Sequence, residues 1–171
     1  MPASFPPTRF QKYAWLSLWK AVKDSAGGIE VIYPGIREPI ATPTEEWISI
    51  HPIAVNPDRR PRGSWAGIFL FQISCYSVLA DARQDGSTDR PFEIADLIET
   101  ALSRKDIDVR DYQSDNTSTQ SLGVISVHEG RTAYVNERDR NLTGIPSSLG
   151  VGLPVNVHSV ALTFRGYVLI H

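Results

Sequence analysis

The sequence predicts an α+β domain in which a single mixed, mostly antiparallel β-sheet packs against two α-helices and carries long loops. Three observations support this fold class. Two segments repeat apolar residues every three or four positions, as amphipathic helices do. Several other segments alternate apolar and polar residues, as strands do. The elements follow the order helix, strands, helix, strands, which is typical of α+β proteins rather than of repeated strand–helix units.

The composition predicts one globular domain over residues 1–171. The chain is 42% hydrophobic and 21% charged, and its formal net charge of -2 gives no general attraction to nucleic acid or acidic membranes. No apolar run reaches the roughly 20 residues of a membrane helix, and we expect no membrane association. The single cysteine, Cys75, excludes an intrachain disulfide. It lies in an apolar run, where we expect a small buried hydrophobe.

The first third of the chain predicts an extended arm, a helix and a short strand. Three prolines make residues 1–8 a poor helix, and we expect an N-terminal arm there. Thr8 is expected to cap a helix over residues 9–24, which Gly27 and Gly28 would end. Its expected apolar stripe is Trp15, Leu18, Trp19 and Val22. A short β-branched strand is expected over residues 29–33.

The middle of the chain predicts a pair of strands and a second helix. Strands are expected over 46–53 and 65–80, with a hairpin tip at 56–64 because of its Pro, Gly and Arg content. The second strand has one wholly apolar face, which must be core: Phe69, Phe71, Ile73 and Cys75. A helix is expected over residues 90–104, with Pro91 in its first turn. Its expected buried stripe is Ile94, Leu97, Ile98, Ala101 and Leu102.

The last third predicts further strands between irregular segments. A short strand is expected over 107–112, followed by a polar loop at 113–120. Two runs, 122–128 and 132–136, flank Glu129-Gly130 and predict a hairpin. Residues 137–154 show little periodicity, and a long strand over 155–170 closes the chain. In this strand the apolar residues Val160, Leu162, Phe164 and Val168 alternate with Ala161, Thr163, Arg165 and Tyr167.

The segment between the long strand and the second helix, Asp81–Asp89, raises the question of a phosphate cradle. Such a cradle needs several glycines so that backbone N–H groups converge on the phosphate. This segment has one glycine and no lysine, and its three aspartates would repel a phosphate. A solvated connection and a protein-contact loop are the favoured interpretations, and a nucleotide site is the least favoured of the three.

The residues that usually carry catalysis or metals do not assemble in the sequence. The four histidines lack metal-ligand spacing, and no GxSxG elbow is present. Cys75 shares an apolar strand face, which makes a thiol a poor nucleophile. We therefore expect no enzyme activity, no metal and no cofactor. The histidines are His51, His128, His158 and His171.

Two charged clusters suggest contacts with other proteins. Arg59, Arg60 and Arg62 form the one compact basic cluster. A solvated loop, an acidic protein partner and a nucleic-acid backbone all stay open for it, the last without the aromatic residues that usually accompany such binding. The mixed stretch Glu137–Arg140 suits ion pairing between subunits better than phosphate binding.

The chain resembles the tail terminator proteins of long-tailed bacteriophages. The resemblance lies in the order and character of the elements from residue 11 to residue 169. The opening helix is QKYAWLSLWKAVKD, and a strand and proline turn follow in IEVIYPGIREPIATPTEEWISIHPI. The most telling part is a strand, a small polar loop and an amphipathic helix, RGSWAGIFLFQISCYSVLADARQDGSTDRPFEIADLIETAL, and VNVHSVALTFRGYVL closes the chain.

The resemblance implies a virion protein that forms a ring, commonly of six copies, at the head-proximal end of the tail tube. Such a ring ends tube polymerisation and joins the tail to the head connector, and genomic DNA passes through its lumen without sequence-specific binding. The implied partners are other copies of the chain, the major tail tube protein, the connector or stopper protein and the tape-measure protein. The implied location is the tail neck, after assembly in the host cytoplasm.

By hypothesis, the charged segments contact neighbouring subunits or partners in that ring. The alternatives are another neck or tail-completion protein, a small non-viral protein-binding module without catalysis, and an enzyme with an unrecognised site. The expected contact residues are Arg59, Arg60, Arg62, Asp81, Arg83, Asp85, Asp89, Arg138 and Arg140.

Overall fold

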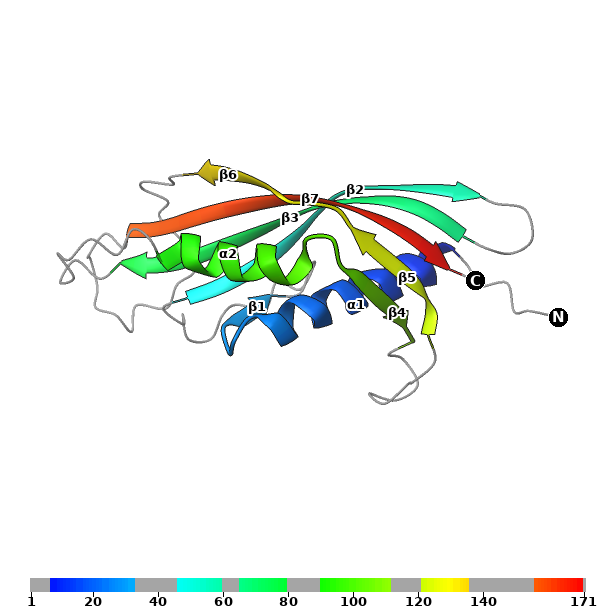
Figure 1. The fold of residues 1–171 in the computed structure, drawn as a ribbon, viewed down its shortest axis with the longest axis horizontal. Coiled ribbons are helices and arrows are strands. Elements are labelled where there is room, and N and C mark those ends of the chain that lie inside the picture. Colours follow the sequence, from blue (N-terminus) through cyan, green and yellow to red (C-terminus); the bar gives the residue numbers. More distant parts are fainter. Residues whose placement is uncertain are drawn as a thin grey trace.

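The structure is a computed structural model that describes residues 7–32, 46–59, 65–79, 90–111, 121–135 and 156–170. These residues form one seven-stranded sheet and two helices, which confirms the predicted α+β fold (Figure 1). The elements are α1 (Pro7–Ser25), β1 (Glu30–Ile32), β2 (Glu46–Arg59), β3 (Trp65–Leu79), α2 (Arg90–Leu102), β4 (Asp106–Arg110), β5 (Ser121–Val127), β6 (Arg131–Val135) and β7 (Asn156–Ile170).

The sheet is built around the two longest strands. β3 and β7 pair antiparallel along their whole length, from Trp65 opposite Ile170 to Leu79 opposite Asn156. The strand order is β1-β2-β3-β7-β5-β4, and β6 also pairs with β7. Only the β1–β2 pair is parallel, so the sheet is mixed and mostly antiparallel, as predicted.

The expected hairpin between 122–128 and 132–136 is wrong. β5 and β6 do not pair with each other, because both pair with β7: β5 along Gly166–Ile170 and β6 along Ser159–Thr163. β7 has 15 residues and is long enough to hold two short strands one after the other. Between them the chain passes close to the core, since a Cβ on Gly130 would lie 2.7 Å from Cε1 of Phe164.

The first helix begins earlier than the sequence suggested. α1 starts at Pro7, so Thr8 lies inside the helix and its predicted role as the cap is wrong. Proline fits the first helical position because the N–H that it lacks would have no partner there. The predicted end is confirmed: Gly27 and Gly28 have φ of 62° and 96°, a left-handed conformation that glycine adopts without steric cost.

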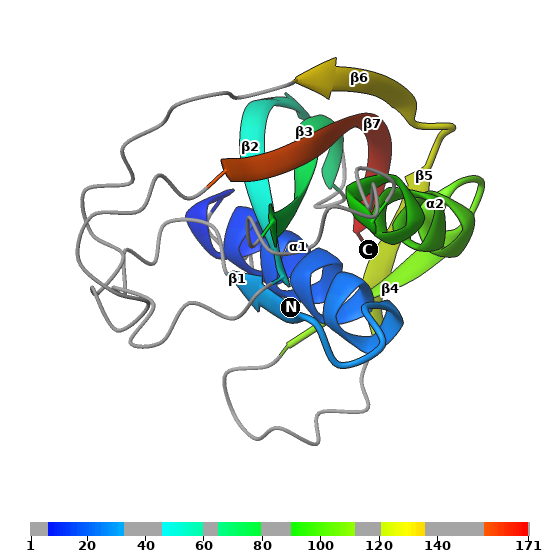
Figure 2. The same ribbon diagram turned by 90° about the vertical axis from the view of Figure 1, so that its left-hand side faces the viewer.

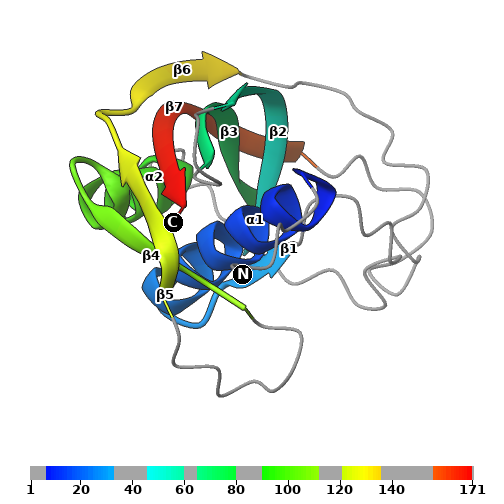
Figure 3. The ribbon, with the colours of Figure 1, turned by 90° about the vertical axis from the view of Figure 1, so that its right-hand side faces the viewer.

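Both helices pack against the same face of the sheet, which curls over them (Figures 2 and 3). The core lies in this hollow, and the predicted apolar faces of β3 and β7 both point into it. Trp15 of α1 packs on Phe69 at 5.0 Å between ring centroids, and Phe71 stacks on Phe164 at 5.4 Å. The largest fully buried side chains are Phe69, Phe71, Phe164, Leu18, Ile48, Ile73, Ile94, Ile98, Leu102, Ile125, Leu162 and Val22.

The predicted buried stripe of the second helix is wrong at one residue. Leu97 is 45% exposed, whereas Ala95, which the prediction left out, is 2% exposed. The buried stripe of α2 is therefore centred on Ile94, Ile98 and Leu102, and the helix is rotated relative to the predicted orientation. Both residues are apolar, so their types alone could not reveal which of them faces the sheet.

β2 extends further than predicted. The hairpin tip was expected from Asn56, but β2 continues through Pro57 to Arg59, which lies opposite Trp65 of β3. A register shift between Pro52 and Ala54 marks a bulge at Ile53. Proline is tolerated here because β2 has an open side over these residues of the described sheet, where no N–H is needed for the ladder.

Candidate functional site

The nine expected contact residues fall mostly outside the described residues. Arg59 is the exception, as the last residue of β2. The other eight are Arg60, Arg62, Asp81, Arg83, Asp85, Asp89, Arg138 and Arg140. The described strands nevertheless fix where the segments that contain them join the sheet.

The basic and acidic segments join opposite ends of the same strand. The basic segment connects Arg59 to Trp65, at the start of β3, and the acidic segment follows Leu79, at its end. A strand of 15 residues spans about 45 Å. Asn156 of β7 lies opposite Leu79, so the segment with Arg138 and Arg140 joins the sheet at the same end as the acidic segment.

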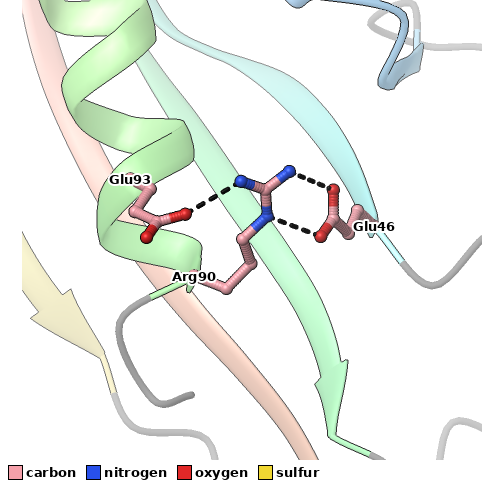
Figure 4. Close-up of polar contacts among 3 residues, drawn as sticks. All are labelled: Glu46, Arg90 and Glu93. Carbon is pink, nitrogen blue, oxygen red and sulfur yellow. Dashed lines mark hydrogen bonds and ion pairs between the residues drawn. The ribbon is translucent and has the colours of Figure 1, made fainter.

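An arginine ties the beginning of α2 to the sheet at this acidic end (Figure 4). Nε and Nη2 of Arg90 donate to the two carboxylate oxygens of Glu46 at 2.7 and 3.0 Å, and Nη1 donates to Glu93 at 2.8 Å. Hydrogen bonds to Glu46, and then to Glu93, raise the pKa of Arg90. A cation at a helix N-terminus is unfavourable by itself, so the two carboxylates explain why arginine is stable there.

The edges of the described sheet differ in how well they are protected against pairing with a strand of another chain. At one edge, β1 covers only Trp47–Ser49 of β2, and the rest of β2 carries Pro52, Pro57 and a bulge, features that discourage pairing with another chain. At the other edge, α1 lies against β4, and the N–H of Arg110 donates to Oγ of Ser17 at 3.1 Å. Among the described strands, β6 pairs only with β7, so its second edge is the least protected.

The face of the sheet opposite the helices carries an exposed apolar patch. Tyr167 and Leu169 of β7 are 44% and 37% exposed, and they point away from the core because the alternate residues Val168 and Ile170 point into it. Neighbouring strands add half-buried apolar side chains, since Ile68 lies opposite Tyr167 and Val124 lies opposite Leu169. We name Ile68, Leu70, Val124, Tyr167 and Leu169 the outer-face patch.

No catalytic arrangement is present among the described residues. No three His, Cys, Asp or Glu side chains in these ranges converge to hold a metal ion. His51 is hydrogen-bonded to Ser49 at 2.7 Å, while His128 is exposed and distant in the sheet. Cys75 is fully buried, as predicted, and burial raises the pKa of its thiol to about 12, which makes it a poor nucleophile.

A depression lies beside α2 in the described part of the chain. It has a volume of about 440 Å³, and an ion pair between Arg104 and Glu129 lies at its rim. Its carboxylates are exposed or half-exposed, and every buried side-chain N or O atom in the described ranges has a partner. Its lining is Asp96, Glu99, Thr100, Ser103, Glu129 and Gly130.

Sequence reasoning missed the outer-face patch and the pairing of Arg90. The alternation along residues 155–170 places Arg165 and Tyr167 on one face, which is a usable signal, but only the strand pairing brings Ile68 and Val124 beside them. The partners of Arg90 are 44 and 3 residues away, and only the nearer one follows from helix geometry.

The comparisons with known proteins give no family. No protein-family model matches the chain, and no curated protein matches it. Within the described ranges, neither helix is long and apolar enough to cross a membrane.

Proposed function

We propose that this chain is a structural virion protein that forms a ring at the head-proximal end of a phage tail tube. In this role it ends tube polymerisation and joins the tail to the head connector. The proposal rests on the resemblance of the sequence layout to tail terminator proteins. The structural observation that supports it is that oppositely charged segments join the two ends of β3.

The charges of the two segments suit a head-to-tail contact. Residues 56–64 hold three arginines and one aspartate, whereas residues 80–89 hold three aspartates and one arginine. A ring with cyclic symmetry needs two different, complementary surfaces on each subunit. Because the segments join the sheet about 45 Å apart, the basic segment of one copy is well placed to meet the acidic segment of the next.

The ion pairs of Arg90 support such a contact at the acidic end. Arg90 links α2 to Glu46 where the acidic segment enters the helix. The same end receives the segment that carries Arg138 and Arg140 before β7. The ion pair therefore holds in place two of the elements that flank the proposed contact surface, and a fixed surface loses less conformational entropy on association.

The proposed partners follow from the position of the ring between the tail tube and the head connector. The chain contacts its own copies, commonly six, and its two ring faces contact the major tail tube protein and the connector or stopper protein, with the tape-measure protein as a further contact. The formal net charge of -2 suits a lumen through which DNA passes without being held. The proposed location is the neck of the virion, and the role needs no cofactor and no catalysis.

The test is the native mass of the purified protein, measured by light scattering over a range of concentrations, with negative-stain images of the same samples. Closed rings, alone or after addition of tail tubes, are the expected result. Reversing Arg59, Arg60 and Arg62 to Glu should weaken ring formation at least about tenfold, since several charge pairs would become repulsive.

A compensating set makes this test specific. Reversing Asp81, Asp85 and Asp89 to Lys in the same chain should restore rings, because the two ends would again carry opposite charges. Lys105→Glu, on an exposed residue after α2, is the matched control and should leave rings unchanged. A monomer that ignores tail tubes, or rings that tolerate the triple reversal, would overturn the proposal.

A further inference from the structure

We infer that the outer-face patch is a twofold contact site for a second copy of this chain. The site is separate from the charged segments of the proposed ring and does not depend on that function. Its residues lie on the neighbouring strands β3, β7 and β5, and no described helix covers them (Figure 3).

Exposed apolar side chains give the first reason for a contact. Tyr167 and Leu169 stand side by side on β7, two residues apart, and are 44% and 37% exposed. Ile68 and Val124 flank them on the two neighbouring strands. A contiguous apolar surface across three strands, with polar residues around it, is typical of a protein–protein contact.

The charges around the patch give the second reason. Arg165 is exposed on the same face of β7, and Asp106 is exposed on β4, where it accepts a hydrogen bond from Ser126 at 2.6 Å. Neither Arg165 nor Asp106 forms an ion pair with another described residue. The patch therefore carries an open positive charge at one side and an open negative charge at the other.

The pairing register makes this arrangement self-complementary. Arg165 lies two residues before Tyr167, and Asp106 lies two strands away from it, through Ser126. On a regular sheet these steps are about 7 and about 10 Å. Consider a line that lies along the surface of the sheet and crosses β7 between Tyr167 and Leu169. On a regular sheet this line can be drawn at equal distances from Arg165 and Asp106.

The same line also lies midway between Ile68 and Val124, which occupy the strands on either side of β7. A second copy turned by 180° about this line would place its Asp106 against Arg165 and its Val124 against Ile68. Tyr167 and Leu169 would each lie near their own copies. This is the relation that an isologous interface requires, in which residue i contacts residue j and j contacts i.

The curvature of the sheet limits the size of the contact. The helices fill the hollow side, so the outer-face patch lies on the convex side, where only its central residues can meet a second convex surface (Figures 2 and 3). A contact of this kind belongs with the smaller, transient interfaces. The dimer should therefore depend on concentration.

A charge exchange tests the inference. Arg165→Asp and Asp106→Arg should each raise the dissociation constant of the dimer at least about tenfold, because like charges would then meet across the axis. The double variant should return to within about threefold of the wild type. The measurement is sedimentation equilibrium of the full chain, with circular dichroism to verify that each variant is folded.

Two controls separate this contact from the ring. Lys12→Glu changes the charge by the same amount as a single reversal but lies on α1, on the other face of the sheet, and it should leave the dimer unchanged. The dimer should also persist when Arg59, Arg60 and Arg62 are reversed, so loss of rings and loss of the dimer are distinguishable. A triple-reversal variant that stays monomeric, or single reversals at Arg165 or Asp106 that leave the dimer intact, would overturn the inference. So would a double variant as weak as the single ones.

Discussion

Arg90, the first residue of α2, contacts both carboxylate oxygens of Glu46, the first residue of β2, at 2.7 and 3.0 Å. The two residues are 44 positions apart in the sequence. An arginine that binds a carboxylate at two points has a more defined geometry than a lysine, because its planar guanidinium matches the carboxylate. The pair therefore fixes the start of α2 relative to the edge of the sheet.

Removing this ion pair should lower the free energy of unfolding. Arg90→Gln should cost about 1 kcal/mol, at the upper end for an exposed pair, because the guanidinium also binds Glu93. Arg90→Lys should fall between the wild type and Arg90→Gln, since it keeps the charge and loses the two-point contact. Urea unfolding at low and high salt is the measurement, and the cost should shrink at high salt.

Lys20→Gln is the matched control for Arg90. Lys20 forms an ion pair with Asp24 one turn away on α1, with both side chains largely exposed, and its loss should cost less than about 0.5 kcal/mol. An equal loss of unfolding free energy in the two variants would mean that the Arg90 contacts stabilise the fold no more than an ordinary surface ion pair does.

The neighbours Leu97 and Ile98 on α2 should respond very differently to truncation. Ile98 is fully buried under the sheet, so Ile98→Ala should lower the free energy of unfolding by about 2–5 kcal/mol through lost burial and the cavity left behind. Leu97 is 45% exposed, and Leu97→Ala should cost less than about 1 kcal/mol. The measurement is chemical unfolding of both variants, and the m-values should stay unchanged. Similar costs for the two would contradict the orientation of α2.

The sequence predicts the parts of this fold that are governed by local patterns. The core faces of β3 and β7 follow from simple alternation, because a side chain two residues along a strand lies on the same face. The end of α1 follows from two glycines. The rotation of α2 does not, since Leu97 and Ala95 are both apolar and only contact with the sheet decides between them.

Non-local pairing explains the remaining differences. The sequence places β5 and β6 on either side of a glycine, which is a hairpin signal, yet β7 offers each of them a longer partner strand. The outer-face patch depends on the same information. Arg165 and Tyr167 share a face by alternation, but the position of Asp106 relative to them depends on the strand order β7-β5-β4. Strand order is a tertiary property that no local pattern encodes.

The thiol of Cys75 should make stability fall in alkaline solution. Burial raises its pKa from 9.0 to about 12. Between these two values the folded chain keeps the thiol proton and the unfolded chain has lost it, so raising the pH through this range favours unfolding. The contribution is fully present below pH 9 and is lost as the pH rises toward 12. Urea unfolding of the wild type and of Cys75→Ala over this range is the measurement.

Cys75→Ala isolates this effect from the titration of lysines and tyrosines, which both proteins share. The difference in unfolding free energy between the wild type and the variant should therefore narrow as the pH rises above 9. Thiol labelling tests the burial of Cys75 independently, because a fully buried thiol reacts only when the chain opens. Labelling of Cys75 should be slow in the native protein and rapid in urea. A native thiol that reacts as fast as a free cysteine would show that β3 is open to solvent at Cys75, and the predicted alkaline slope would then disappear as well.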